Sequence, residues 1–498
     1  MNFYLGIDFG TTGARSTVID AAGTIYSETE YTFDSEGAIP EQQKAELPKA
    51  WETALFGLIE QIPADIRSFV RSIAIDGTSS TVLLCDTDGN PVSEPILYND
   101  ARGALVMDRI RAIAPPNHAV LSATSSLAKL LWWLEGGLEA HPTRKLALGE
   151  TGILRGWRAL EGGLEAHPTR KLALGGTGIL PVVENVAKCE FDRTALYFLH
   201  QADWLAFLLH GKLGISDYQN ALKLGYDVAN LCYPSWLTEG IAGVASAIAP
   251  LLPQVVAPGT AVGEVRAQMC DRFGFPRDCI VCAGTTDSIA AFLASGVNAP
   301  GEAVTSLGST LAVKLLSHTR VDDARYGIYS HRFTPLFEGA TGGDLWLVGG
   351  ASNTGGAVLR HFFTDAELES LSQKIDAEQE SLLDYYPLLK KGDRFPINDS
   401  ELPPRIEPRP TDSVEFLHGL LSSIARIEAR GYQLLQELGA PPLTKVYTAG
   451  GGAKNAVWSA IRQRYLKVPV VTPVHTAAAY GSALLAKHGS QSILDFRF

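Results

Sequence analysis

The chain has 498 residues, of which 46% are hydrophobic and 19% charged, a composition typical of a folded globular protein with more than one domain. Its 42 Lys and Arg against 54 Asp and Glu give a net charge of −12 without a basic block, which argues against nucleic acid or an anionic membrane as partner. No apolar run reaches the roughly 18–20 residues that span a bilayer, and no charged leader precedes an apolar stretch. We therefore expect a cytoplasmic protein, with an organelle address left open.

The first predicted element joins a strand, a carboxylate and a polar turn. An apolar strand over residues 5–9 contains Asp8, the turn Gly10-Thr11-Thr12-Gly13 follows, and strand character resumes at residues 16–20. Such a hairpin presents backbone N–H groups and two hydroxyls beside a carboxylate, which suits phosphate oxygens and a hydrated magnesium ion. It is not a P-loop, because no Gly-Lys-Ser/Thr follows and no helix begins after the turn. An ordinary hairpin with glycine in its turn is the alternative.

The rest of the first half alternates strands and helices with polar turns. We predict a third strand over 26–33, a helix over 48–62, and two short strands over 72–77 and 82–86. A long amphipathic helix should begin at 99–102, and a further helix should cover 198–211. The turns Thr78-Ser79-Ser80 and Asn99-Asp100-Ala101-Arg102 carry hydroxyls, an amide, a carboxylate and a guanidinium. This set suits a polyhydroxylated substrate, with Ser79 and Asp100 as candidate contacts. Turn-forming and helix-capping roles are the alternative.

One region is a tandem repeat. Residues 134–154 recur at 160–180 with a single difference, Glu150 against Gly176. Two copies are too few for a stacked solenoid. We therefore interpret residues 134–183 as an insertion in a surface loop. The equivalent histidines His141 and His167 are better explained as exposed side chains than as metal ligands.

The second half repeats the strand–turn chemistry of the first. A Pro/Gly-rich stretch at 249–260 predicts a boundary between domains 1–248 and 249–498. An apolar strand over 279–284 then leads to Asp287 at the start of a helix, a position from which a carboxylate can take the proton of a hydroxyl attacking a γ-phosphate. A helix N-cap is the alternative for Asp287. Cys279 and Cys282 have the spacing of a redox or zinc pair, but their apolar surroundings favour a structural role.

Two more turns of the second half can bind a nucleotide. Gly308-Ser309-Thr310 separates strands predicted over 303–307 and 311–316, and Gly450-Gly451-Gly452 with Asn455 opens a helix over 456–465. Glycines let the backbone approach a phosphate or a flat ligand, and a helix start adds partial positive charge. Two lobes built alike, with such turns facing each other, indicate a nucleotide held between them.

Taken in this order, the motifs resemble those of the FGGY carbohydrate kinases. The resemblance covers nearly the whole chain apart from the repeat, and it rests on residues 8–13, 98–102, 284–288, 308–310, 349–356 and 450–455. It implies an α/β fold of two ribonuclease H-like domains, the actin and sugar-kinase ATPase superfold, with a cleft between them.

The resemblance also implies transfer of a phosphoryl group from ATP to a sugar or polyol hydroxyl, with Mg²⁺ as cofactor. It makes Asp287 the catalytic base and puts Asp8 near Mg²⁺ and the reacting hydroxyl. It implies ATP contacts from Thr11, Thr12, Gly13, Gly308, Ser309, Thr310, Gly451, Gly452 and Asn455, and substrate contacts from Asp8, Ser79, Asp100 and Asp287. The partner expected is a small-molecule sugar, and the expected state is a monomer or homodimer.

The substrate is inferred from departures within the family. Glycerol kinases show an Arg-Glu pair after the second-layer strand and xylulokinases show Gln-Met-His-Gly, whereas this chain has Gly77-Thr78-Ser79-Ser80. The segment from Asp76 to Ser80 looks more like that of the cyanobacterial and plant kinases of the family that act on D-ribulose. D-ribulose is therefore the expected substrate and D-xylulose the alternative. A conformational ATPase like actin or a chaperone is the alternative from another class, and the turns at Asp100 and Asp287 speak against it.

Overall fold

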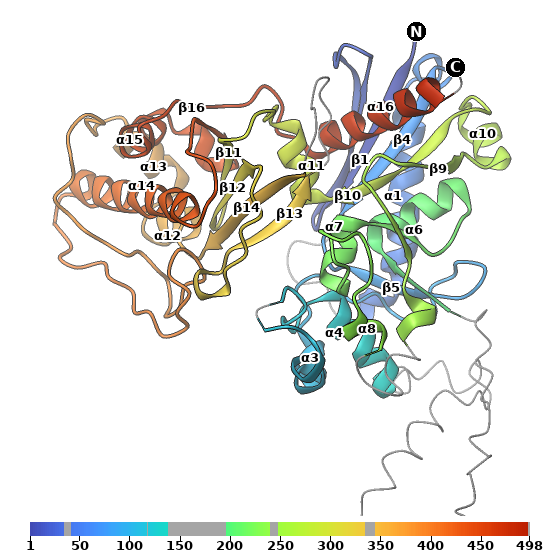
Figure 1. The fold of residues 1–498 in the computed structure, drawn as a ribbon. Coiled ribbons are helices and arrows are strands. Elements are labelled where there is room, and N and C mark those ends of the chain that lie inside the picture. The colour runs from blue at the N-terminus through green and yellow to red at the C-terminus, as the bar shows by residue number, and fades with distance from the viewer. Residues whose placement is uncertain (34–40, 117, 138–195, 240–247, 334–343, 497–498) are drawn as a thin grey trace, which may run out of the picture.

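The computed structural model describes residues 1–33, 41–116, 118–137, 196–239, 248–333 and 344–496. Figure 1 shows two lobes, and each is built around a six-stranded sheet. The predicted insertion at 134–183 lies outside the described residues except for its first part, which belongs to the π-helical turn η3 (Trp133–Gly137). His141 and His167 also lie outside them.

The two sheets share a core of five strands in the same order, and each has its sixth strand, β9 or β13, at the opposite edge. In the first sheet the spatial order is β3 (Ile25–Thr32), β2 (Gly13–Ile19), β1 (Phe3–Phe9), β4 (Val70–Gly77), β10 (Ile280–Thr286) and β9 (Ala261–Glu264). In the second it is β13 (Tyr329–Phe333), β14 (Leu345–Ser352), β12 (Leu311–Ser317), β11 (Glu302–Leu307), β15 (Lys445–Ala449) and β16 (Val470–Val471).

Each sheet begins with an antiparallel hairpin whose first strand then pairs in parallel with a later strand. In the first sheet β1 pairs with β2 antiparallel and with β4 parallel. In the second sheet β11 pairs with β12 antiparallel and with β15 parallel. The predicted echo between the two halves of the chain is therefore confirmed, as is the α/β, two-domain fold class.

Two small sheets and a set of helices complete the lobes. The small sheets are β5 (Val82–Cys85) with β6 (Tyr197–His200), and β7 (Ile215–Asp217) with β8 (Gln254–Val256). The α-helices of the first lobe are α1 (Leu47–Gln61), α2 (Ala64–Arg67), α3 (Met107–Ile113), α4 (Ser126–Trp132), α6 (Gln201–His210), α7 (Tyr218–Ala221), α8 (Ser235–Thr238), α10 (Ala267–Phe273) and α11 (Asp287–Ala294). The later helices are α12 (Gly356–Phe362), α13 (Asp365–Ser372), α14 (Ser413–Glu437), α15 (Ala456–Leu466) and α16 (Ala478–Phe496). Short 3₁₀ turns are η1 (Glu41–Glu46), η2 (Arg102–Val106), η4 (Leu222–Leu224), η5 (Ala249–Leu251), η6 (Ala324–Tyr326) and η7 (Gly451–Lys454).

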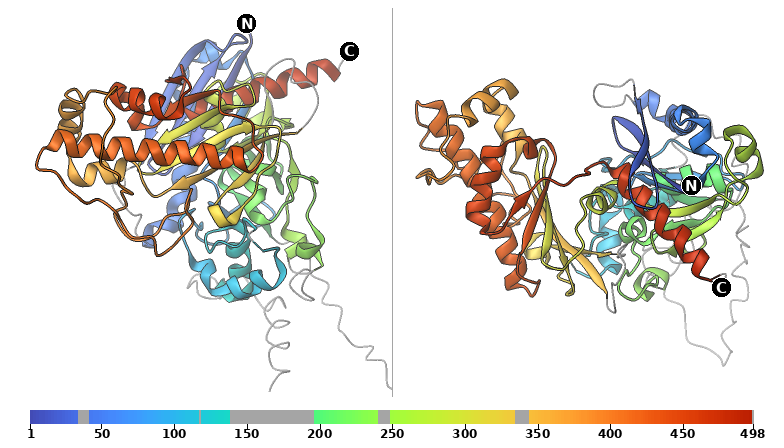
Figure 2. Two further views of the ribbon diagram at one scale, coloured as in Figure 1. Left: turned by 60° about the vertical axis from the view of Figure 1, so that its left-hand side comes forward. Right: turned by 90° about the horizontal axis from the view of Figure 1, so that it is seen from above.

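The C-terminal helix α16 returns to the first lobe and covers one face of its sheet, as Figures 1 and 2 show. The contact is close, because a Cβ built on Gly6 of β1 would lie 2.0 Å from the carbonyl oxygen of Ala479. Leu5 and Ile7 face the opposite side, where they pack with Trp51 of α1. The polar even-numbered position Asp8 therefore lies on the α16 side of the sheet.

Two predicted elements differ from those observed. The long amphipathic helix expected from residues 99–102 is instead the 3₁₀ turn η2 followed by the short helix α3. It stops at Ala114 because Pro115 follows, and a residue before proline is disfavoured in the helical region. The helix predicted over 198–211 begins only at Gln201, since residues 197–200 pair with β5 as a strand.

The strand pairing also bears on which lobe carries which residue. The division into domains 1–248 and 249–498 stays a prediction, while the change of sheet falls later, between β10 and β11. The predicted boundary puts Asp8 and Asp287 in different domains, so the sequence predicts one carboxylate from each lobe, and this is wrong. Asp287 directly follows β10, so both carboxylates belong to the first sheet.

The remaining structural expectations concern the cysteines and the membrane. Cys279 and Cys282 are buried free thiols, which confirms their structural role. In the described part of the chain, the helices are too short or too polar to cross a bilayer.

Candidate active site

Three neighbouring parallel strands bring polar side chains to one edge of the first sheet. Asp8 of β1 is in register with Asp76 of β4, and Asp76 is in register with Thr285 of β10. Asp287 follows two residues later as the first residue of α11. Carboxyl ends of parallel strands are the usual ligand-binding edge of an α/β sheet. The expected pair Asp8 and Asp287 therefore lies at one edge, together with a third carboxylate, Asp76, that the sequence analysis did not propose.

Several buried polar atoms at this edge have no hydrogen-bond partner among the described residues. Asp76 accepts a hydrogen bond at Oδ2 from Ser482 of α16 (2.6 Å), but its Oδ1 is buried without a donor. The hydroxyls of Ser80, Thr285 and Thr286 are buried and unpaired in the same way. A buried polar group without a partner costs about 1–3 kcal/mol. Their concentration where two strands end indicates that a polar ligand or water completes them.

The carboxylates at this edge repel one another. Burial raises the pKa of Asp8, while an interaction with the Asp76 side chain lowers it. Burial, the negative charge of Asp8 and the same side-chain interaction raise the pKa of Asp76 well above its usual value, and the charge of Asp287 adds to the rise. Burial also raises the pKa of Asp287, and the charge of Asp8 adds to the rise. The hydrogen bond from the Ser288 N–H to Asp287 Oδ1 (2.5 Å) acts in the opposite direction. A divalent cation would relieve this repulsion.

Two lysines offset part of this negative charge. The positive charges of Lys314 and Lys223 both lower the pKa of Asp287. Lys314 stands on β12 of the second lobe, and its Nζ donates to the carbonyl oxygen of Ser288 (2.8 Å). Burial lowers the pKa of Lys314 to about 8. Thus the second lobe contributes a cation, rather than a carboxylate, next to Asp287.

The alternative explanation of Asp287 as a helix N-cap does not match its position. Thr286 is the N-cap residue of α11, and Asp287 is the first residue inside the helix. Its side chain accepts only the adjacent Ser288 N–H among the described hydrogen bonds. The remaining carboxylate oxygen is available to a ligand.

The two hydroxyl-bearing hairpin turns are open to solvent. In the β1–β2 turn the Gly10 N–H donates to the Gly13 carbonyl (3.0 Å), and Thr11 and Thr12 are exposed. In the β11–β12 turn the Gly308 N–H donates to the Thr310 carbonyl (3.2 Å), and Ser309 and Thr310 are exposed. Exposed hydroxyls at the tip of a hairpin can donate hydrogen bonds to phosphate oxygens, as the sequence predicts.

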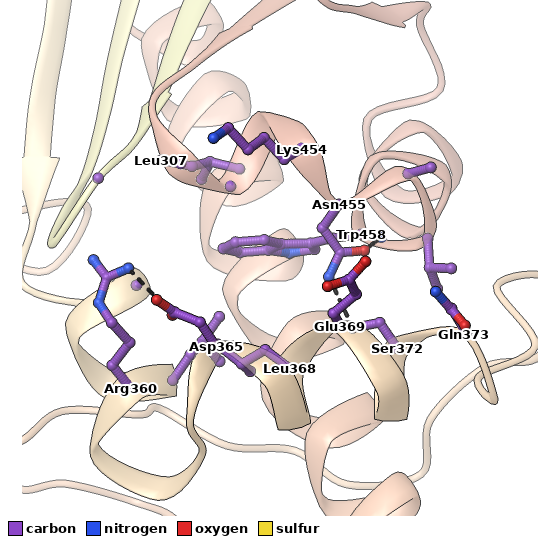
Figure 3. A pocket seen from close by; sticks show the side chains of 17 residues that line it. Leu307, Arg360, Asp365, Leu368, Glu369, Ser372, Gln373, Lys454, Asn455 and Trp458 are labelled. Carbon is purple, nitrogen blue, oxygen red and sulfur yellow. Dashed lines mark hydrogen bonds and ion pairs between the residues drawn. The ribbon is translucent and has the colours of Figure 1, made fainter.

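A pocket of about 570 Å³ lies in the second lobe, within the size range of small-molecule sites (Figure 3). In Figure 3 the Trp458 ring lies between Leu307 and the side chains of α13. The pocket is formed by the ends of β11 and η7 and by α12, α13 and α15, with the lining residues Leu307, Gly308, Gly356, Leu359, Arg360, Asp365, Leu368, Glu369, Ser372, Gln373, Gly451, Gly452, Lys454, Asn455, Ala456, Val457 and Trp458.

Some of the expected nucleotide contacts line this pocket and some do not. Gly308, Gly451, Gly452 and Asn455 line it, whereas the expected contacts in the β1–β2 turn and at residues 309 and 310 lie outside it. Both polar atoms of the Asn455 side chain already have protein partners. Its Oδ1 accepts from the backbone N–H of Trp458 (2.9 Å), and its Nδ2 donates to the Ser372 hydroxyl (2.8 Å). It therefore shapes the pocket wall.

The glycines at the pocket have distinct roles. Gly450 has φ +83°, a conformation that favours glycine. A Cβ on Gly452 would lie 2.6 Å from Cβ of Leu307 and 2.8 Å from the Trp458 ring, whereas one on Gly451 would meet nothing within 4 Å. The turn needs glycine for backbone shape at Gly450 and for space at Gly452.

The expected substrate contacts Ser79 and Asp100 lie on two adjacent loops of the first lobe. Ser79 is half-buried in the turn after β4. Asp100 is bound by Arg102 (2.7 Å) and lies 3.6 Å from Lys44. Burial acts to raise the pKa of Asp100, but the hydrogen bonds and charge of Arg102 outweigh it and lower the pKa. The turn-forming alternative for Asp100 is thus realised, since it also accepts the Arg102 backbone N–H (3.0 Å).

Models of both domains of one protein family match the chain. The N-terminal domain of the FGGY family of carbohydrate kinases matches residues 3–142, and its C-terminal domain matches residues 303–490. The chain belongs to the FGGY family of carbohydrate kinases. The family resemblance seen in the sequence is confirmed, and ATP is the phosphoryl donor that the family implies.

Curated relatives of this FGGY kinase carry several substrate names. A xylulose kinase from Staphylococcus epidermidis is 21% identical over 505 residues, covering 97% of this chain and 87% of the relative. A gluconokinase from Bacillus licheniformis is 21% identical over 531 residues, covering 99% and 89%. A glycerol kinase from Thermococcus kodakarensis is 26% identical over 140 residues, covering 27% and 28%.

Solved structures share the fold of this FGGY kinase at low identity. Plasmodium falciparum glycerol kinase with ADP superposes with a TM-score of 0.74 at 16% identity, covering 100% of this chain and 92% of that one. A ligand-bound xylulose kinase from Lactobacillus acidophilus gives 0.70 at 14% identity, covering 99% and 90%. Such likeness establishes the fold and leaves the substrate to the residues of the site.

Sequence reasoning missed several residues of this kinase's candidate site. Asp76 and Lys314 each stand within an apolar strand, and Trp458 follows the glycine turn. An ionisable residue in an apolar element is rarely buried without a function or a partner. That signal was present in the sequence, but which side chains meet depended on strand order.

Proposed function

We propose that this kinase transfers the γ-phosphoryl group of ATP to a hydroxyl of a ketopentose, with D-ribulose as substrate and D-ribulose 5-phosphate as product. The observation that carries the proposal is the gathering of Asp8, Asp76 and Asp287 at one sheet edge beside unpaired buried hydroxyls. Lys314 from the second lobe adds a cation there.

In this proposal Asp287 is the general base. It accepts the proton of the sugar hydroxyl while the oxygen of that hydroxyl forms a bond to the γ-phosphorus and the bond from phosphorus to the bridging oxygen of ADP breaks. Lys314 and Lys223 favour the ionised form of Asp287 and carry charge opposite to that of the transferring group. The position of the two lysines next to Asp287 supports both roles, favouring its ionised form and attracting the transferring phosphoryl group.

The nucleotide is divided between the pocket and the turns. The pocket beside Gly451 and Gly452 has the volume for a base and ribose. The exposed turns at Thr11, Thr12 and Gly13 and at Ser309 and Thr310 provide N–H groups and hydroxyls for the phosphates.

The residues present fit a magnesium ion. Mg²⁺ is usually held by one or two carboxylates together with substrate phosphates. Asp8 and the undonated Oδ1 of Asp76 are oxygen ligands of this kind once both carboxyls are ionised, although among the described residues no three such side chains are placed to hold a metal ion together. A bound Mg²⁺ would offset the charge of the triphosphate, with Asp8 as its proposed ligand.

The substrate assignment rests on the turn after β4. Ser79 and Ser80 offer hydroxyls without filling space, which suits a small polyhydroxylated sugar. D-xylulose is the second candidate, because it differs from D-ribulose only in the configuration of one carbon and several relatives are named xylulose kinase. A monomer or homodimer remains our expectation for the assembly.

The test is a comparison of kcat/KM for ADP formation with D-ribulose, D-xylulose, L-ribulose, glycerol and gluconate. We expect D-ribulose to give the highest value. A higher kcat/KM for D-xylulose would make D-xylulose the substrate and leave the proposed phosphoryl transfer unchanged. Equal ATP turnover with and without every carbohydrate would refute the kinase mechanism.

A further inference from the structure

A lysine on α4 links the two loops that carry the proposed sugar contacts. Lys129 is completely buried, and its Nζ donates to the carbonyl oxygens of Ser80 and Leu97, both at 2.7 Å. Ser80 ends the turn that contains Ser79, and Leu97 begins the loop that contains Asp100. One side chain thus sets the distance between the two loops.

The Ser80 turn needs this support. Ser80 has φ +62°, a left-handed conformation that a non-glycine residue adopts at some cost. Its hydroxyl is buried and has no partner among the described residues. A strained backbone that holds an unpaired hydroxyl in a buried position is typical of a ligand contact.

The helix that carries Lys129 is itself held rigidly. Ser125 caps it by accepting the Ala128 N–H (3.2 Å). Ser126, three residues before Lys129, hydrogen-bonds His200 Nε2 (3.0 Å), and His200 Nδ1 lies 3.1 Å from Asp203. Ser126 and His200 are completely buried and the Asp203 side chain is nearly so, so this hydrogen-bonded chain fixes α4 rather than reacting with a substrate.

Lys129 has a donor to spare and no counter-ion. An ammonium has three N–H donors, and only two acceptors are found among the described residues. Both are neutral carbonyls, and no carboxylate forms an ion pair with it in this part of the chain. Burial lowers the pKa of Lys129 to about 7, while the charge of Asp100 acts in the opposite direction. Burying the ammonium form in this way is costly, so packing alone does not explain a lysine here.

We propose that Lys129 is a substrate-positioning residue, which holds the Ser80 and Leu97 loops in place and donates its third N–H to a hydroxyl or the carbonyl oxygen of the sugar. The hydrogen bonds of Lys129 to the Ser80 and Leu97 carbonyls place it between the loops that carry Ser79 and Asp100. The inference rests on the proposed sugar-kinase function of this site.

The test compares Lys129→Met and Lys129→Arg with Lys212→Met as a matched control. Lys212 also donates to a backbone carbonyl, Val262 (2.6 Å), but is exposed and far along the chain from the sugar loops. A hydrogen bond to a charged group changes affinity by about 10- to 100-fold. We therefore expect the KM for sugar to rise by about this factor in both Lys129 variants. The KM for ATP should stay within twofold, and Lys212→Met should match the wild type.

Singly deoxygenated pentuloses separate contact from packing. In the wild type, loss of the hydroxyl that Lys129 binds should raise KM, and in Lys129→Met the same deoxy sugar should be no worse than the parent sugar. Lys129→Arg keeps the positive charge, so it can be measured if Lys129→Met does not fold. The deoxy sugars can also be measured on the wild type alone, so that part of the test does not depend on any variant folding. A sugar KM within twofold of wild type in a folded variant, with only the melting temperature lowered, overturns the proposal. A wild-type KM that is the same for the parent sugar and for every deoxy sugar also overturns it.

Failure of the proposed function would look different. In that case the wild type itself would phosphorylate no pentulose, and the same variants would be measured on whichever carbohydrate of the panel the wild type does phosphorylate. A raised KM for that carbohydrate in the Lys129 variants supports the positioning role, and an unchanged KM overturns it.

Discussion

A buried ion pair between strands and helices next to the proposed nucleotide pocket offers the most direct test of the second lobe. Arg462 of α15 donates from Nε and Nη2 to the two carboxylate oxygens of Glu428 on α14 (2.6 and 2.7 Å) and from Nη1 to Thr448 of β15 (2.6 Å). Glu428 also accepts from Thr305 of β11 (2.6 Å). Both charged side chains have 0% exposure. Because β11 and β15 lead to the Gly308 and Gly450–Gly452 turns, the network fixes the floor of the pocket.

The perturbation is Arg462→Met, which leaves Glu428 buried and unpaired. Removing one partner of a buried pair costs about 3–5 kcal/mol. With about 2–4 °C per kcal/mol for a domain of this size, the transition of the second lobe should fall by roughly 6–20 °C. The double variant Arg462→Met/Glu428→Leu removes both charges and should recover part of this loss.

Differential scanning calorimetry of the single and double variants, with and without a nonhydrolysable ATP analogue, measures the effect. The KM for ATP should rise in Arg462→Met while the KM for sugar changes less, since the network joins β11, β15, α14 and α15, none of which carries a proposed sugar contact. A loss below about 1 kcal/mol for Arg462→Met, or a double variant whose loss equals the sum of both singles, would refute this reasoning.

The remaining predictions concern the catalytic base and the glycine turn. Asp287→Asn should lower kcat by about 10²- to 10⁴-fold while stabilisation by the ATP analogue persists; a loss under tenfold in steady-state kinetics contradicts the base role. Because burial raises the pKa of Asp287 and the base must be ionised, kcat/KM should fall as pH falls through that raised pKa. Lys314→Met removes a charge that lowers this pKa, so the acid limb of the pH–rate profile should move to higher pH, and a move to lower pH would be inconsistent. Gly452→Ala forces a Cβ to 2.6 Å from Leu307 and should weaken ATP binding by about 1–3 kcal/mol, roughly 5- to 150-fold, whereas Gly57→Ala on α1, whose Cβ would lie 3.8 Å from the Tyr31 ring, should bind as the wild type does; calorimetric titration with equal affinities for both would contradict the packing argument.

The sequence alone determined the elements whose chemistry is local. The apolar run ending in Asp8, the Gly308 turn and the Gly451 turn are each legible because a few consecutive residues set their backbone angles and exposed groups. The amphipathic stripe of α1, with Trp51 and Leu55, is equally local, and both are buried as its spacing requires. These patterns were also enough to predict the fold class and the family.

Only the tertiary structure decided which of these elements meet. Asp76 became a neighbour of Asp8, and β10 carried Asp287 into the first sheet, through strand pairings between residues far apart in the chain. Ser482 and Lys314 reach the same edge from α16 and β12. Local patterns fix which face of a strand is apolar, but the partner of that strand depends on burial summed over the whole chain.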